Sequence, residues 1–257
     1  MTRFKIVLSY DGAEFVGWQR QAAGVSVQGL LEDALRVLDG QDVTVIGAGR
    51  TDAGVHALAQ VAAFTLARDI DPATLVRALN ANLPPAVRAL DAAIVPASFH
   101  PQFNAHAKVY RYRICNADAV SPFERGRVWH VPGPLHVDAM RAAARLLEGD
   151  HDFVAFQATG SDVETTRREI FSSRIVDCGS SPGSALLCYE VAGDGFLRHM
   201  VRIIVGSLVE IGRGRQPAEW LGRVLASRDR RAAGPTAPPH GLFLVRVEYP
   251  SALAAGS

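Results

Sequence analysis

Cysteine is scarce in this chain of 257 residues: the three cysteines, Cys115, Cys178 and Cys188, are widely spaced. A sparse, odd set predicts a reducing compartment such as the cytoplasm and argues against a disulfide framework. No C-x-x-C pair occurs, so structural zinc is not expected. His100 and His106 have no acidic or cysteine cluster beside them, and we expect neither to bind a metal ion.

Long apolar runs are also missing. No stretch approaches the length of a membrane span, and residues 1–5 do not form an apolar signal region. We therefore expect a soluble, cytoplasmic protein without a membrane partner. The hydrophobic fraction of 48% is enough for a sizeable core.

A charge excess of one sign is lacking as well, since 27 Lys and Arg face 26 Asp and Glu. A nucleic-acid-binding protein is usually more basic. Arginines nevertheless gather at residues 167–168, 213–215 and 228–231. Each group alone is typical of a solvated face. Together they could form a basic groove that the net charge conceals.

The most informative stretch spans residues 47–60 and reads G-A-G-R-T-D-A-G-V-H-A-L-A-Q. Its glycines bracket Arg50, Thr51 and Asp52 and permit a tight turn with close approach of another molecule. In an extended segment Arg50 and Asp52 point to one side, and their charges would hold each other in place. A hairpin turn with a surface ion pair is the plain alternative. Phosphate-loop and dinucleotide-binding patterns do not fit, because their glycine and lysine spacings are missing.

Hydrophobic periodicity divides the chain into two similar series of elements. The first series has strands at 3–9, 43–46, 57–66 and 87–95, and helices from Ser26 to Gly40 and from Asp71 to Asn82. The second has strands at 108–115, 168–178, 185–192 and 242–249, and helices at 137–147, 196–211 and 217–226. A turn is expected at 179–183.

This order predicts an α+β fold with two similar halves, each an antiparallel four-stranded sheet backed by helices. We place the boundary near Ala105, which gives an N-terminal half of 1–105 and a C-terminal half of 106–257. An active-site cleft between the halves is expected, because such junctions commonly hold sites.

Asp52 is the lone carboxylate of the glycine-bracketed loop. Hydrolysis by paired carboxylates is poorly supported, because no second carboxylate accompanies Asp52. Nearby arginines would keep a lone aspartate ionised, and an ionised carboxylate suits a nucleophile or a base better than an acid. Tyr110 would share a strand face with Tyr112, and Arg198 and Arg202 would share a face of the helix at 196–211. A half-buried strand aromatic and a helix-surface charge are the plain alternatives for Tyr110 and Arg202.

The stretch G-A-G-R-T-D-A-G-V-H-A-L-A-Q-V resembles the active-site motif of the bacterial tRNA pseudouridine synthase A family. Three further segments resemble the same family: Y-D-G-A-E-F-V-G-W-Q-R-Q with S-V-Q-G-L-L-E-D-A-L, F-L-R-H-M-V-R-I-I-V-G-S-L, and R-D-R-R-A-A-G-P-T-A-P-P-H-G-L-F-L-V-R-V-E-Y-P. The likeness covers nearly the whole chain.

The resemblance implies a pseudouridine synthase fold and the isomerisation of uridine to pseudouridine at positions 38, 39 and 40 of the tRNA anticodon stem-loop. It further implies a homodimer that binds one tRNA across both subunits, without a metal or organic cofactor. Asp52 matches the family's catalytic aspartate, and Arg50 its companion arginine that helps displace the target base. Either attack of Asp52 on C1′ or removal of the C2′ proton to give a glycal fits the sequence.

Further site residues follow from the same motifs. Tyr110, in V-Y-R-Y, matches the tyrosine that stacks on the target base. Arg202, in H-M-V-R, matches the arginine that pairs with the aspartate. Leu242 or Leu244 would supply the apolar wall under the tyrosine.

The chain departs from the family pattern at two places. Gln102 stands where the family usually has an arginine, and the second-half loop G-S-D-V-E-T-T-R-R lacks a proline. Under the resemblance, both departures put the details of tRNA binding in question, and Arg167 or Arg168 could compensate. Three alternatives remain: an RNA-binding module without catalysis, a pseudouridine synthase with another RNA target, and a glycosidase-like hydrolase. The last lacks an acid partner for Asp52.

Overall fold

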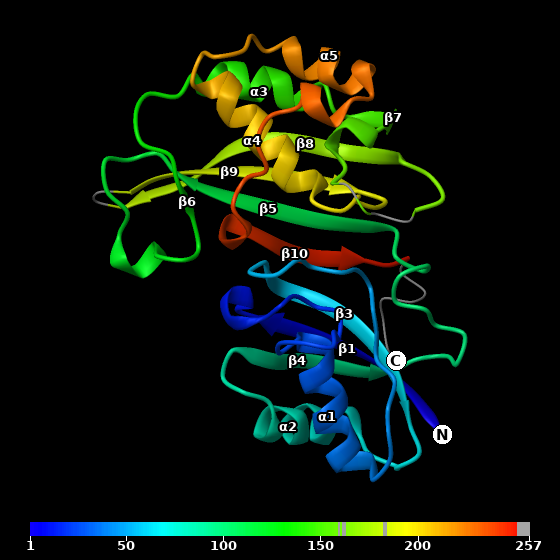
Figure 1. Ribbon diagram of the computed structural model, residues 1–257. Helices are drawn as coiled ribbons and strands as arrows, with labels where there is room; N and C mark the ends of the chain where they lie inside the picture. Colours follow the sequence, from blue (N-terminus) through cyan, green and yellow to red (C-terminus); the bar gives the residue numbers. More distant parts are fainter. Residues whose placement is uncertain (159, 161–162, 182–183, 251–257) are drawn as a thin grey trace. The chain divides into compact units, whose positions relative to one another are not determined.

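The computed structural model describes residues 1–158, 160, 163–181 and 184–250. The chain divides into two units (Figure 1). Unit 1 comprises Met1–Lys108 and Phe243–Ser257, and unit 2 comprises Val109–Leu242. Each unit contains strands and helices of its own.

Apart from its first residue, Leu242, the last strand, β10 (Leu242–Glu248), thus belongs to unit 1, whereas the sequence pattern assigned it to the second half. Phe243 and Leu244 pair in parallel with His56 and Ala57, and this pairing joins β10 to β3. Whether 1–105 and 106–257 act as separate domains stays a prediction.

The sheet of unit 1 has antiparallel strands in the order β4-β1-β3. Its strands are β1 (Thr2–Tyr10), β2 (Ile46–Gly47), β3 (His56–Leu66) and β4 (Val87–Ile94), followed by β10. Phe4, Ile6 and Leu8 alternate along β1 and are fully buried, as one face of a strand packed on a core should be. β2, which pairs with β3, is shorter than predicted.

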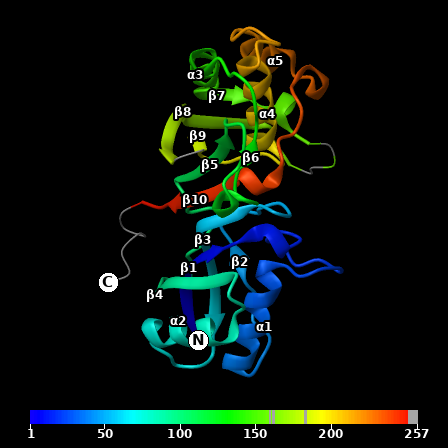
Figure 2. The same ribbon diagram turned by 90° about the vertical axis from the view of Figure 1, so that its left-hand side faces the viewer.

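Two helices, α1 (Val27–Asp39) and α2 (Pro72–Asn82), complete unit 1 and lie side by side (Figure 2). The predicted helix starts are confirmed: Ser26 Oγ accepts a hydrogen bond from the Gly29 N–H at 3.2 Å, and Asp71 caps α2. Such side-chain caps satisfy N–H groups that the first helical turn leaves unpaired. Gly40 ends α1 with a φ of 74°, also as predicted.

The sheet of unit 2 has the order β5-β9-β8-β7. Its strands are β5 (Ala107–Cys115), β6 (Trp129–His130), β7 (Gly149–Asp152), β8 (Arg167–Ser181) and β9 (Ser184–Gly193). β7 was not predicted, because its sequence, G-D-H-D, has no apolar alternation. β8 extends into the predicted turn, two residues of which, Pro182 and Gly183, lie outside the described residues.

Three helices, α3 (Val137–Arg145), α4 (Met200–Gly212) and α5 (Trp220–Ser227), gather on one side of this sheet (Figure 1). α3 contacts β8, α4 and α5. α4 begins later than predicted, because His199 has a φ of 61°, a left-handed conformation that does not fit a right-handed helix. Arg198 therefore precedes the helix, and the prediction that Arg198 and Arg202 share one helix face is wrong.

The cysteines correct another expectation. Cys178 and Cys188 form a disulfide between β8 and β9, with a Cα–Cα distance of 5.8 Å. Val176 is paired with Cys188, and Cys178 lies two residues further along β8, where diagonal neighbours of a hairpin meet. Cys115 is a buried free thiol.

The mixed α+β class with mostly antiparallel strands is confirmed. β3–β10 and β5–β6 are parallel pairs. Across the described ranges, no helix has the length and apolar character needed to cross a membrane.

Candidate active site

The glycine-bracketed stretch of unit 1 forms the loop between β2 and β3. Asp52 lies in an isolated antiparallel bridge with Gly17, and its carbonyl oxygen accepts a hydrogen bond from the Val55 N–H at 3.1 Å. Gly54 has a φ of 76°, a conformation that favours glycine. The half-buried Asp52 is thus held at a tight turn by backbone contacts on both sides.

The segment that follows β1, which includes Phe15 and Trp18, supports this loop through backbone hydrogen bonds. The Trp18 N–H donates to the Thr51 carbonyl at 3.0 Å, and the Gly54 N–H lies 3.4 Å from the Phe15 carbonyl. Trp18 is only 2% exposed, so this support is part of the core of unit 1. The N-terminal segment that resembles the family contains these residues, but nothing in its pattern indicated that they support the loop around Asp52.

A buried histidine closes the loop on its C-terminal side. His56 is 2% exposed, and its Nδ1 lies 3.1 Å from the Gly12 N–H and 3.0 Å from Asp11 Oδ1. The imidazole stacks on the ring of Phe243 at 4.6 Å. Sequence reasoning read Asp11-Gly12 only as a turn and missed this contact.

Arg50 is exposed, and its guanidinium forms no hydrogen bond or ion pair within the described part of the chain. The expected mutual holding of Arg50 and Asp52 is therefore wrong. The buried Thr51 lies between the two residues along the loop. An ion pair exposed to water stabilises a fold only slightly, because it must offset the entropy lost when the arginine side chain is ordered. Arg50 is left available to a ligand.

Tyr110 lies on β5 in unit 2 and is 7% exposed. The ring of Phe196 meets it edge-on, with 5.0 Å between centroids. Tyr112 follows on the same strand face and donates its hydroxyl to the Pro238 carbonyl at 2.7 Å. The predicted alternation along β5 is confirmed, and Tyr110 has a fixed orientation.

Arg202 lies in the first turn of α4. Its Nε donates to the Ala237 carbonyl at 2.8 Å, and the Ala237 N–H donates back to the Arg202 carbonyl at 3.0 Å. These two bonds fasten the 234–238 loop to α4. Burial raises the pKa of the Tyr112 hydroxyl, and the positive charge of Arg202 opposes that rise.

The remaining predicted residues are placed as follows. Leu242 and Leu244 are 5% and 0% exposed. Arg167 forms an ion pair with Asp150 at 2.9 Å, and both side chains are exposed. Arg168 Nη1 donates to the Thr165 carbonyl at 2.9 Å.

The predicted residues therefore fall into two groups. Unit 1 contains Arg50, Asp52 and Leu244, and unit 2 contains the other five, Tyr110, Arg167, Arg168, Arg202 and Leu242. Their assignment to one site stays a prediction.

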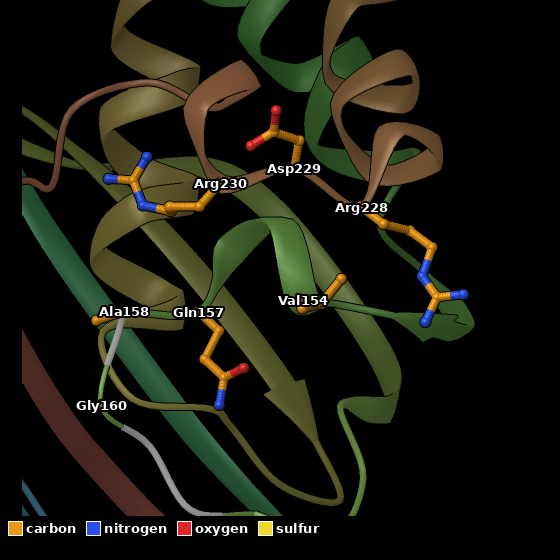
Figure 3. Close-up of a pocket in the computed structure, with 7 residues that line it drawn as sticks. All are labelled: Val154, Gln157, Ala158, Gly160, Arg228, Asp229 and Arg230. Carbon is orange, nitrogen blue, oxygen red and sulfur yellow. The ribbon is translucent and has the colours of Figure 1, made fainter.

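A pocket of about 290 Å³ lies elsewhere in unit 2, between the short helix η3 (Val154–Phe156) and residues 228–230 after α5 (Figure 3). Its two arginine side chains point in opposite directions. Arg228 is held by Asp152 at 2.5 Å, and Arg230 by the Thr236 hydroxyl at 3.2 Å. None of the predicted site residues lines this pocket. In the described ranges, no three His, Cys, Asp or Glu side chains gather closely enough to hold a metal ion.

Comparison with known proteins agrees with the loop motif. A family model described as tRNA pseudouridine synthase matches residues 6–104 and 143–250. The chain is 47% identical to the tRNA pseudouridine synthase A of Myxococcus xanthus, over 97% of this chain and 92% of that protein. Identity to the tRNA pseudouridine synthase A of Solibacter usitatus is 48%, over 97% of this chain and 100% of that protein.

Among solved structures, a chain from a Cbf5-Nop10-Gar1 complex aligns over 80% of this chain and 45% of its own length. Its 12% identity and TM-score of 0.33 are too low to carry a structural inference. The family model and the curated relatives confirm the resemblance carried by the motifs. The chain therefore belongs to the tRNA pseudouridine synthase family, whose members are isomerases.

Proposed function

We propose that this chain isomerises uridine to pseudouridine at positions 38, 39 and 40 of the anticodon stem-loop of tRNA, with Asp52 as the catalytic carboxylate. One observation supports this role above the others: a tight, glycine-bracketed turn holds a half-buried Asp52 beside an exposed arginine that has no partner in the described residues. Family membership supplies the reaction class.

The reaction breaks the C1′–N1 bond of a uridine and forms a bond between C1′ and C5. The uracil must turn before it is rejoined, and C5 then loses its hydrogen as a proton while N1 gains one. The isomerisation is redox-neutral and consumes no water. In one route, Asp52 attacks C1′ and is displaced when C5 forms its bond to C1′. In the other route, Asp52 removes the C2′ proton to give a glycal, and C2′ is reprotonated when C5 bonds to C1′.

A uridine stacked in a stem is out of reach of a carboxylate, so the target nucleotide must be extruded. We assign to Arg50 the displacement of the base, because its planar guanidinium is exposed and able to stack or donate hydrogen bonds. Tyr110 stacks on the extruded uracil, a contact that recognises a flat face rather than a base sequence.

Other assignments rest on the resemblance alone. Arg202 takes part in the reaction, Leu242 or Leu244 packs under the tyrosine, and Arg167 or Arg168 binds the tRNA backbone. We further propose that the protein acts as a homodimer in the cytoplasm. A monomeric mass at working concentration would contradict the dimer.

The test is release of tritium from a tRNA transcript labelled at C5 of uridine. C5 loses its hydrogen when it becomes the new glycosidic carbon. We expect release with the wild type, none with Asp52→Ala, and wild-type release with Asp42→Ala, a control that removes an exposed carboxylate. Affinity of Asp52→Ala for tRNA should stay within a few-fold.

The target positions are tested with transcripts that keep uridine at only one of the three positions. Turnover by Asp52→Ala would overturn the role of the carboxylate. No release by the wild type, with tRNA binding intact, would favour an RNA-binding module or another RNA target.

A further inference from the structure

Two buried hydroxyl groups meet beneath the Asp52 loop. The Tyr10 hydroxyl, at the end of β1, lies 2.9 Å from the Thr51 hydroxyl. The two residues are 3% and 6% exposed, and Thr51 directly precedes Asp52. A hydrogen bond closed off from water is electrostatically stronger than an exposed one and fixes geometry more firmly.

We propose that Tyr10 is a positioning residue, which holds Asp52 at its working place through the hydroxyl of Thr51. The inference rests on the proposed function, because it assigns to Asp52 the reacting carboxylate. Tyr10 itself need not touch the uridine.

Thr51 is fixed through its main chain as well as its side chain. Its carbonyl accepts the Trp18 N–H at 3.0 Å, while its hydroxyl meets Tyr10. The next residue, Asp52, is bridged to Gly17. Removal of the Tyr10 hydroxyl would leave Thr51 with the hydrogen bond from the Trp18 N–H alone. The residue directly before Asp52 would then be less firmly positioned.

A third side chain completes the support. Gln60 on β3 is fully buried and donates its Nε2 to the Gly49 carbonyl at 2.9 Å. It also hydrogen-bonds the Tyr10 hydroxyl. Gln60 therefore holds the loop at Gly49, and Tyr10 holds it at Thr51. These two loop residues flank Arg50.

Burial raises the pKa of Tyr10 to about 12, even though the hydrogen bonds from Thr51 and Gln60 lower it. The phenol therefore stays neutral at physiological pH. Its contribution is an oriented hydrogen bond rather than a charge or a proton acceptor for the reaction.

The test compares Tyr10→Phe, Thr51→Val and the double variant by single-turnover tritium release at saturating tRNA. Small misplacements of a reacting group slow chemistry strongly, so each single variant should react about 10- to 100-fold more slowly, with the dissociation constant for tRNA within about twofold. The double variant should be no slower than the worse single variant, because both remove the same hydrogen bond. Thr51→Ser keeps the hydroxyl and should restore most of the rate.

A matched control exists in unit 2. The Tyr189 hydroxyl lies 2.9 Å from the Ser173 hydroxyl, and both residues are fully buried. Tyr189→Phe removes an equivalent hydrogen bond that is remote in sequence from the Asp52 loop. It should lower the melting temperature about as much as Tyr10→Phe and leave the single-turnover rate unchanged.

Unchanged rates in Tyr10→Phe and Thr51→Val would overturn the inference alone, provided the wild type releases tritium. An equal loss of rate in Tyr189→Phe would also overturn it, because general destabilisation would then explain the effect. No release by the wild type would overturn the proposed function and this inference together.

Discussion

Gly12 and Val55 are in direct backbone contact: a Cβ atom added to Gly12 would lie 2.0 Å from the Val55 carbonyl oxygen. No heavy atom tolerates such an approach, and the atom it would meet belongs to the main chain. The segment after β1 and the Asp52 loop must therefore part if Gly12 gains a side chain.

Gly12→Ala should accordingly lower the free energy of unfolding by about 1–3 kcal/mol, the usual cost of overpacking a tight interior. It should also slow tritium release, because the displaced backbone carries Asp52. Denaturant unfolding and single-turnover kinetics measure the two effects.

Gly222→Ala is the matched control. Its added methyl would meet only Leu146 Cδ1 at 3.7 Å, and Gly222 lies in α5. A helical glycine replaced by alanine should stabilise the protein by about 0.5–1 kcal/mol. Equal stability of Gly12→Ala and the wild type would contradict the contact.

Arg50→Lys should separate stability from activity. The side chain is exposed and has no partner in the described residues, so unfolding should change by less than about 0.5 kcal/mol. Tritium release should nevertheless fall sharply, because an ammonium group lacks the planar fork of a guanidinium. Arg223→Lys, an exposed arginine of α5, should leave both quantities unchanged. Full activity of Arg50→Lys would remove the arginine from the proposed step.

Tyr110 tests stacking against hydroxyl chemistry. Tyr110→Phe keeps the ring and its edge contact with Phe196, so the reaction rate should stay within a few-fold of the wild type. Tyr110→Ala loses the stacking surface, which for a nucleobase contributes about 1–3 kcal/mol. Rates and tRNA affinity of both variants decide the point, and a Phe variant as impaired as the Ala variant would argue for the hydroxyl instead.

Asp152 provides a pH-dependent prediction. The Thr166 hydroxyl donates to its carboxylate at 2.6 Å, and Arg228 lies at 2.5 Å. The Thr166 hydrogen bond foremost, with smaller contributions from the Val154 N–H and Arg228, lowers the pKa of Asp152 below its ordinary value. A lowered native pKa contributes stability above the pKa of the unfolded chain, about 4, and that contribution is lost as pH falls through the native pKa.

Asp152→Asn should therefore reduce the free energy of unfolding by about 1.5–3 kcal/mol at pH 7, the net contribution of a hydrogen bond to a charged group. The difference from the wild type should shrink below about pH 4. Denaturant unfolding at neutral and acidic pH measures it. The same difference at both pH values would show that the carboxylate's charge has no part in it.

Much of the local structure could be predicted because its causes are local. Ser26, Asp71 and Gly40 mark helix ends through contacts with residues a few positions away. Alternation along β1 and β5 records which face is buried. Predictions failed where a remote partner or a backbone turn decides, as at His199, whose left-handed conformation delays the start of α4, and at Cys178, whose partner lies on the neighbouring strand.

The sequence by itself determined the class of protein and the loop that carries its carboxylate, because a glycine-bracketed motif and long matching segments need no coordinates to be read. Only the tertiary structure decided what supports that loop. Tyr10 and Thr51, like Gly12 and His56, are more than 40 residues apart, and strand pairing between β1 and β3 brings them into contact. Burial then makes each such contact specific, because a polar group removed from water needs its partner.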